Sequence, residues 1–170
     1  MGRSARDVMQ TQVITVSPDA PLVSVRQLFV EEGIHGAPVV DDRMRVLGVI
    51  STTDLLRAAS EAHESARPEG HYDMDGVEVF SLGDLGDLDE ALEAHLGETR
   101  VCDYMTDGAV SIPPDASIGE LACEIRKHQV HRVLVVEDGV LEGIVSTLDL
   151  IGLLEQIPAE AIEKALPPAR

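Results

Sequence analysis

Aromatic residues are nearly missing from this sequence, which contains no Trp, two Tyr and two Phe. It therefore offers no set of rings on which the bases of a single-stranded nucleic acid could stack. Positive charge is also scarce, because 13 Lys and Arg residues stand against 31 Asp and Glu residues and give a net charge of −18. The electrostatic field of such a negatively charged protein repels phosphate backbones and anionic lipid surfaces. We expect no nucleic acid and no membrane among the partners of this acidic protein.

Cysteine and long apolar runs are scarce as well. Cys102 and Cys123 are too few for a disulfide framework or a four-ligand zinc site, which fits a reducing compartment, and we expect both to be small core residues. No apolar run approaches the ~18 residues that a bilayer span needs, and the first ten residues contain no apolar signal region. We therefore expect a soluble, cytoplasmic protein.

Two parts of the chain repeat one another. Residues 7–42 align with residues 103–138 without a gap and share nine identities, and residues 48–56 align with residues 143–151 and share five. Each copy predicts the same elements: a short β-branched run, a Pro-Asp turn, a helix with one apolar face, two valine-rich strands joined by a tight turn, and a second helix.

Such a β-α-β-β-α unit of about 50 residues is too small for a good core of its own, so we expect the two units to pack together. Equivalent copies would pack about a pseudo-twofold axis, which would place corresponding loops face to face across a groove. A twofold groove suggests paired sites for a small ligand.

The two copies resemble the cystathionine-β-synthase (CBS) domain, and the tandem resembles a CBS pair, or Bateman module. The resemblance rests on "DVM" and "DYM", on "SPDAPL" and "PPDASI", on "HGAPVVD" and "HRVLVVE", and above all on "GVISTTDLL" and "GIVSTLDLI". It implies an α/β (α+β) fold in a stand-alone CBS-domain protein without an attached catalytic domain. We expect CBS domain 1 with the N-terminal segment at residues 1–60, an acidic insert at 61–100, CBS domain 2 at 101–156, and a C-terminal helix or tail at 157–170.

The resemblance also implies a function. By this resemblance, the protein would be a regulatory or energy-sensing module that binds AMP, ADP, ATP or S-adenosylmethionine between its CBS motifs. The resemblance also implies that the protein is not an enzyme and requires no cofactor or metal. The implied partners are a second copy in a homodimer and an unknown client protein. Carried over by position, the ribose-binding residues are Asp54 and Asp149, and the phosphate-binding residues are Ser51, Ser146, His35, His131 and Arg132. The pocket wall would be Thr15, Ile34, Gly36, Ile50, Ser111, Val130 and Val145.

Elementary chemistry supports these roles but leaves alternatives open. An ionised carboxylate can accept both hydroxyl donors of a cis-diol, and a Ser at the start of a helix lies beside free backbone N–H groups that favour an anion. The pattern Ser-x-x-Asp is equally a capping box that needs no ligand. Arg132 has forked donors that match phosphate, yet it could form a surface ion pair instead, and both histidines could be strand-edge residues bonded to backbone.

The segment between the copies carries 12 acidic residues in 60–100 against Arg67 and Arg100. Leucines at helical spacing predict an amphipathic helix from Asp87 to Leu96, with Gly97 as its stop. This helix could cover the tandem or grip a client. The alternative function is therefore a ligand-free interaction or dimerisation module that uses the acidic insert, or a weak Mg²⁺ binder.

Overall fold

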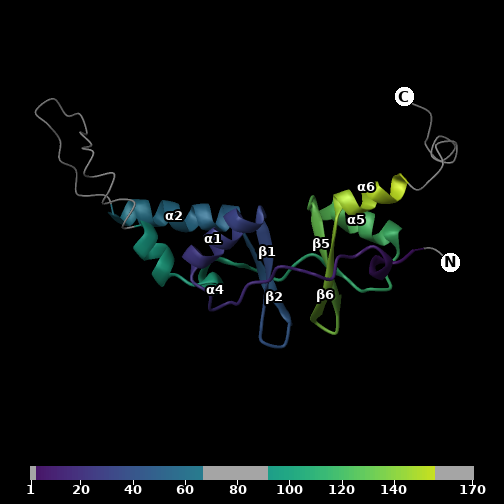
Figure 1. Cartoon of the computed structure of the whole chain (residues 1–170), viewed down its shortest axis with the longest axis horizontal. Coiled ribbons are helices and arrows are strands. Elements are labelled where there is room, and N and C mark those ends of the chain that lie inside the picture. Colours follow the sequence, from purple (N-terminus) through teal and green to yellow (C-terminus); the bar gives the residue numbers. More distant parts are fainter. Residues whose placement is uncertain (1–2, 67–91, 156–170) are drawn as a thin grey trace, which may run out of the picture. The chain divides into compact units, whose positions relative to one another are not determined.

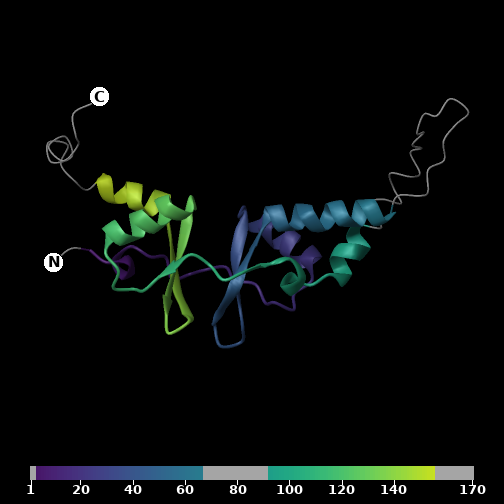
Figure 2. The same cartoon turned by 180° about the vertical axis from the view of Figure 1, so that it is seen from behind.

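The computed structural model describes residues 3–66 and 92–155. The chain forms two compact units: the first-repeat unit comprises Ile14–Gly108, and the second-repeat unit combines Met1–Val13 with Ala109–Arg170. In each unit two helices lie on one side of a β-hairpin (Figures 1 and 2). No helix within the described residues is long and apolar enough to cross a membrane.

The first-repeat unit has a three-stranded sheet in the order β1-β2-β3. Strand β1 (Gly36–Val40) pairs antiparallel with β2 (Val46–Ser51), which pairs antiparallel with β3 (Thr106–Asp107). The helices are α1 (Leu22–Glu32), α2 (Thr52–Ala66) and α4 (Val101–Tyr104), and residues 92–98 are also helical. The predicted hairpin and the two predicted helices of this copy are confirmed.

The core of this unit forms because α1 has one apolar face. Leu22, Val25 and Phe29 are at most 5% exposed, at the helical spacing seen in the sequence. The helix ends at Gly33, whose φ of 62° is left-handed and whose N–H donates to the Phe29 carbonyl. Leu96 is buried in the same core, so helical residues 92–98 cover this unit. The helix runs one residue past the expected stop, and residues 87–91 of its prediction lie outside the described residues.

The second-repeat unit also has a three-stranded sheet, in the order β4-β5-β6, but its third strand lies on the other side of the hairpin. Strand β4 (Ser111–Ile112) pairs parallel with β5 (Arg132–Glu137), which pairs antiparallel with β6 (Val140–Ser146). Its helices are the short 3₁₀ helix η1 (Ala5–Asp7), α5 (Ile118–His128) and α6 (Thr147–Leu154). The predicted mixed α+β fold, with one β-hairpin and two longer helices in each repeat, is thereby confirmed.

Each repeat gives its leading segment to the unit of the other repeat. Gln10 bridges antiparallel to Ile144, just as Thr106 pairs with Val49 in the first-repeat unit. Two backbone hydrogen bonds of each segment also correspond: Ala5 N to Ala116 O (2.8 Å) matches Val101 N to Ala20 O (3.0 Å), and Arg6 N to Pro114 O (2.9 Å) matches Cys102 N to Pro18 O (2.9 Å). The segment from residue 3 to residue 13 thus packs with the second-repeat unit.

This exchange explains the glycine in each "GVIS" or "GIVS" motif. A Cβ atom added to Gly48 would lie 2.3 Å from the Thr106 carbonyl oxygen, and one added to Gly143 would lie 2.8 Å from the Gln10 carbonyl oxygen. Both contacts are shorter than any normal packing distance, so only glycine lets the exchanged segment pair with the strand.

Two local expectations were wrong. Cys102 and Cys123 are exposed, because Cys102 follows the buried Val101 on a short helix and Cys123 lies off the apolar face of α5. The β-branched run 13–16 forms no named strand, since only Val16 makes a parallel bridge to Val39. The expected helix or tail at 157–170 lies outside the described residues.

Candidate functional site

The two motif carboxylates lie in the first turns of α2 and α6, and each accepts hydrogen bonds from the serine that precedes its helix. Asp54 Oδ2 accepts from the Ser51 backbone N–H (2.9 Å) and hydroxyl (2.7 Å). Asp149 Oδ2 accepts the same two bonds from Ser146 (2.7 and 2.6 Å), and its own N–H donates back to the Ser146 hydroxyl (3.3 Å). Both copies therefore show the bonds from serine to carboxylate, α6 also shows the reciprocal bond of a capping box, and one oxygen of each carboxylate faces other groups.

The remaining oxygen has a different partner in each unit. Arg57 Nη2 lies 3.2 Å from Asp54 Oδ1, whereas Gln10 Nε2 donates to Asp149 Oδ1 at 3.0 Å. Asp54 is only 7% exposed, and its partner is a charged guanidinium. Asp149 is less buried and has a neutral amide partner, so its Oδ1 is the more readily available acceptor for a ligand hydroxyl.

The electrostatic environment keeps Asp149 ionised. Burial opposes ionisation, but hydrogen bonds from Ser146 and Gln10 and the positive charge of Arg132 outweigh it, so the pKa of the carboxyl lies below its ordinary value of 3.8. An ionised carboxylate is an acceptor only, which is the state that a ribose diol requires.

The predicted phosphate residues surround the same helix starts. His35 and His131 are exposed, and their backbone carbonyls accept from the N–H of Thr52 and Thr147, each at 3.0 Å. These contacts fix the strand to the helix start and use one N–H of each first turn. The serine hydroxyls also donate to the carboxylates, so an anion would have to displace a bond that already exists.

Arg132 distinguishes the two copies. It lies directly opposite Ser146 in the β5–β6 register, at the position where Gly36 faces Ser51 in the first-repeat unit. Its side chain is exposed and forms no ion pair with any described residue. The second-repeat unit therefore brings together a guanidinium that has no ion pair among the described residues, a serine and an ionised carboxylate, whereas the first-repeat unit has Gly36 in place of the arginine.

The predicted wall residues differ in burial. Ile50 and Val145 are fully buried in the cores of their own units. Thr15, Ile34, Gly36 and Val130 are partly buried, and Ser111 is exposed.

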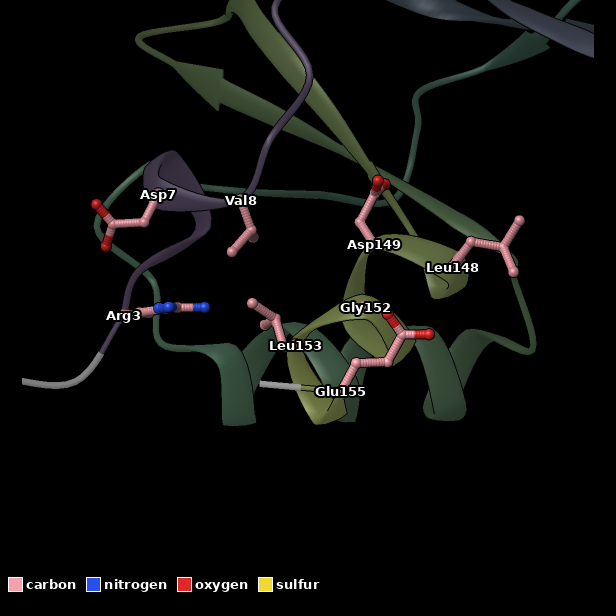
Figure 3. A pocket seen from close by; sticks show the side chains of 8 residues that line it. All are labelled: Arg3, Asp7, Val8, Leu148, Asp149, Gly152, Leu153 and Glu155. Atoms are coloured by element: carbon pink, nitrogen blue, oxygen red, sulfur yellow. The ribbon is translucent and has the colours of Figure 1, made fainter. Parts of the chain in front are cut away.

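An open groove, which sequence reasoning missed, lies between the N-terminal segment and α6. Arg3 and Val8 extend toward the side of α6 that carries Gly152 and Leu153 (Figure 3). Asp149 lies at one end of this groove, and the remaining lining residues are Asp7, Leu148 and Glu155. Within the described residues, no cluster of three His, Cys, Asp or Glu side chains could hold a metal ion.

Comparison with known proteins identifies the family. The family model "CBS domain" matches residues 5–61 and 101–156. The chain belongs to the CBS domain family. The uncharacterized protein MJ1426 of Methanocaldococcus jannaschii is 30% identical to this CBS protein over 152 residues, which cover 88% of this chain and 89% of that protein.

One further relative and one solved structure of similar fold carry names that mention a ligand. The 5′-AMP-activated protein kinase subunit gamma-3 of Homo sapiens is 30% identical over 141 residues, which are 82% of this chain but only 24% of that subunit. The crystal structure of CBSX2 in complex with AMP is similar in fold, with a TM-score of 0.66 and 24% identity over 92% of this chain and 99% of that chain.

Proposed function

We propose that this CBS protein is a regulatory module that binds an adenosine-containing ligand at the β5–β6 end of its second-repeat unit. The observation that carries the proposal is the placement of Arg132 opposite Ser146, beside the ionised Asp149. Asp149 Oδ1 would accept a ribose hydroxyl in place of the Gln10 amide, and the Arg132 guanidinium would contact a phosphate.

Two comparisons support AMP as the first ligand to test. CBSX2 was crystallised with AMP, and the kinase subunit belongs to an enzyme named for its activation by AMP. ADP, ATP and S-adenosylmethionine share the adenosine group and are the competing ligands. A regulatory role further requires that the ligand bind one conformation or partner complex more tightly than another.

The test separates the phosphate contact from the adenosine contact. Thermal unfolding is followed with adenosine, AMP, ADP, ATP and S-adenosylmethionine, since a native-state ligand at a hundredfold excess over its Kd stabilises by about 2.7 kcal/mol. We expect Arg132→Gly, which copies the first repeat, to weaken AMP about tenfold or more and to affect adenosine much less.

Arg43→Gly is the matched control, because Arg43 is an exposed arginine in the loop between β1 and β2 of the other unit. It should leave the AMP response unchanged. The absence of a response to every adenosine compound would refute the proposal, and equal losses with AMP and adenosine in Arg132→Gly would refute the phosphate role.

We also propose a homodimer that forms through α2 and α6. Leu56 and Ile151 occupy equivalent positions of the two repeats and are 63% and 52% exposed, and Leu148 on α6 is 75% exposed. Large apolar side chains at matched exposed positions are typical of an interface. Light scattering should give twice the 18.3 kDa chain mass, and Leu56→Lys with Ile151→Lys should give the monomer mass. A monomeric wild-type protein would refute this assembly.

A further inference from the structure

The two units share one corner whose backbone is the same and whose side chains differ. In each unit this corner lies between a leading segment and the helix that follows the motif serine, which is α2 or α6. The repeat alignment matches Arg57 with Gly152 and Tyr104 with Val8, while the carboxylates Asp54 and Asp149 are kept. Because the backbone hydrogen bonds of the two segments also correspond, the first-repeat corner is a template for the second.

The first-repeat corner is filled by a guanidinium. Arg57 Nη2 donates to the Tyr104 carbonyl at 2.7 Å and lies 3.2 Å from Asp54 Oδ1. The same guanidinium carbon lies 5.4 Å from the centroid of the Tyr104 ring, which is cation–π distance. One positively charged group thus joins a carboxylate, a carbonyl and an apolar face.

The second-repeat corner keeps the acceptors but lacks the guanidinium. A Cβ atom added to Gly152 would meet nothing within 4 Å, and the groove of Figure 3 occupies this space. No described residue donates a hydrogen bond to the Val8 carbonyl, which is the counterpart of the Tyr104 carbonyl. Asp149 Oδ1 accepts one bond from Gln10, and a carboxylate oxygen can accept a second.

Charged groups of both signs surround the groove. Asp149 and Glu155 line it, whereas the Asp7 carboxylate points away from it (Figure 3). Arg3 is the cation among the lining residues, and Arg132 acts on Asp149 from the strand side. Arg3 emerges from the N-terminal segment and forms no ion pair with any described residue, so it can move aside or compete for the same acceptors.

We propose that this groove binds a guanidinium group of another molecule, in the place that Arg57 fills in the first-repeat unit. The guanidinium donates to Asp149 and to the Val8 carbonyl, and its aliphatic stem packs between Leu148 and Leu153. The source is an arginine side chain of a protein or a free guanidino compound, which share this chemistry.

The test is an NMR titration of the full chain that follows the backbone amides of Gly152, Val8 and Leu153. The probes are Nα-acetyl-arginine amide, which has the neutral backbone of a protein residue, and agmatine, which represents a free compound. Nα-acetyl-citrulline amide is the matched control, because its side chain has nearly the same shape without the charge. We expect saturable shifts at these amides and about tenfold or more tighter binding of the arginine probe than of the citrulline probe.

Three variants test whether the guanidinium binds in the groove beside Gly152. Gly152→Arg rebuilds the first-repeat corner and should abolish the shifts, whereas Gly152→Ala adds only a methyl group to open space and should retain them. Arg57→Gly should create a second site with new shifts around Tyr104. Binding of the blocked arginine but not of agmatine identifies a protein side chain, and the reverse identifies a free compound.

Equal affinity for the arginine and citrulline probes, the absence of saturable shifts, or unchanged binding to Gly152→Arg would each overturn the proposal. Asp149 belongs to both proposed sites, so the two ligands would compete for its carboxylate. No adenosine compound enters these titrations, so their outcome does not depend on whether a nucleotide binds.

Discussion

The exchanged segments make a sharp stability prediction at Gly48. A methyl group on Gly48 would lie 2.3 Å from the Thr106 carbonyl oxygen and 3.1 Å from its carbonyl carbon. Both atoms are backbone, so no side-chain rotation relieves the overlap, and β3 must move away from β2. Overpacking costs about 1–3 kcal/mol, and the loss of the Gly48–Asp107 and Val49–Thr106 pairing adds about 1 kcal/mol for each lost hydrogen bond.

Gly48→Ala should therefore lower the free energy of unfolding by about 3 kcal/mol, which corresponds to a Tm lower by about 6–12 °C for a chain of this size. Urea denaturation and thermal melts measure both quantities. Gly152→Ala is the matched control, since its methyl meets nothing within 4 Å and should stabilise α6 by up to about 1 kcal/mol. A Gly48→Ala protein within about 0.5 kcal/mol of wild type would refute the close approach of β3.

Three other predictions concern the helix starts and the core. Ser146→Ala should cost about 1 kcal/mol in urea denaturation through the lost cap, and no loss would contradict its capping role. Asp149 has a lowered pKa, so its stabilisation is present above its ordinary pKa of 3.8 and is lost as pH falls through the lower folded value. Asp149→Asn should flatten the pH dependence of unfolding below about pH 4, and an unchanged pH profile would argue against the lowered pKa. His95 Nε2 is buried and has no hydrogen-bond partner among the described residues, so His95→Leu should raise stability by about 1 kcal/mol in the same assay, and a lower Tm would show that the imidazole has a favourable contact.

The elements that depend on local sequence could be predicted. Hydrophobic periodicity fixes the buried face of α1, and valine-rich runs around short polar turns predict both hairpins. The exchange of the leading segments could not be predicted, because "DVM" and "DYM" carry no local signal of which repeat they contact. Pairing between Gln10 and Ile144 joins residues far apart in the chain.

The candidate site could likewise be predicted where it depends on local sequence and not where it depends on distant contacts. The spacing of Ser146 and Asp149 predicts a capping box, and the capping box is present. The groups that hold the second carboxylate oxygen, Gln10 and Arg57, were missed. Gln10 reaches its carboxylate only through the segment exchange, although Arg57 lies three residues after Asp54 and could have been found as a helical ion pair. The groove beside Gly152 exists because glycine stands where the first repeat has Arg57. The repeat alignment shows this difference, but its meaning becomes clear only when the structure shows what Arg57 contacts.

The central claim is that an adenosine ligand binds through the second repeat. Isothermal titration calorimetry of AMP into the wild-type protein, Asp149→Asn and Asp54→Asn tests it most directly, because the two variants make the same change at equivalent positions. We predict one AMP per chain for the wild type, about tenfold or greater weakening in Asp149→Asn, and little change in Asp54→Asn. Undetectable AMP binding, or a loss in Asp54→Asn equal to that in Asp149→Asn, would contradict the account.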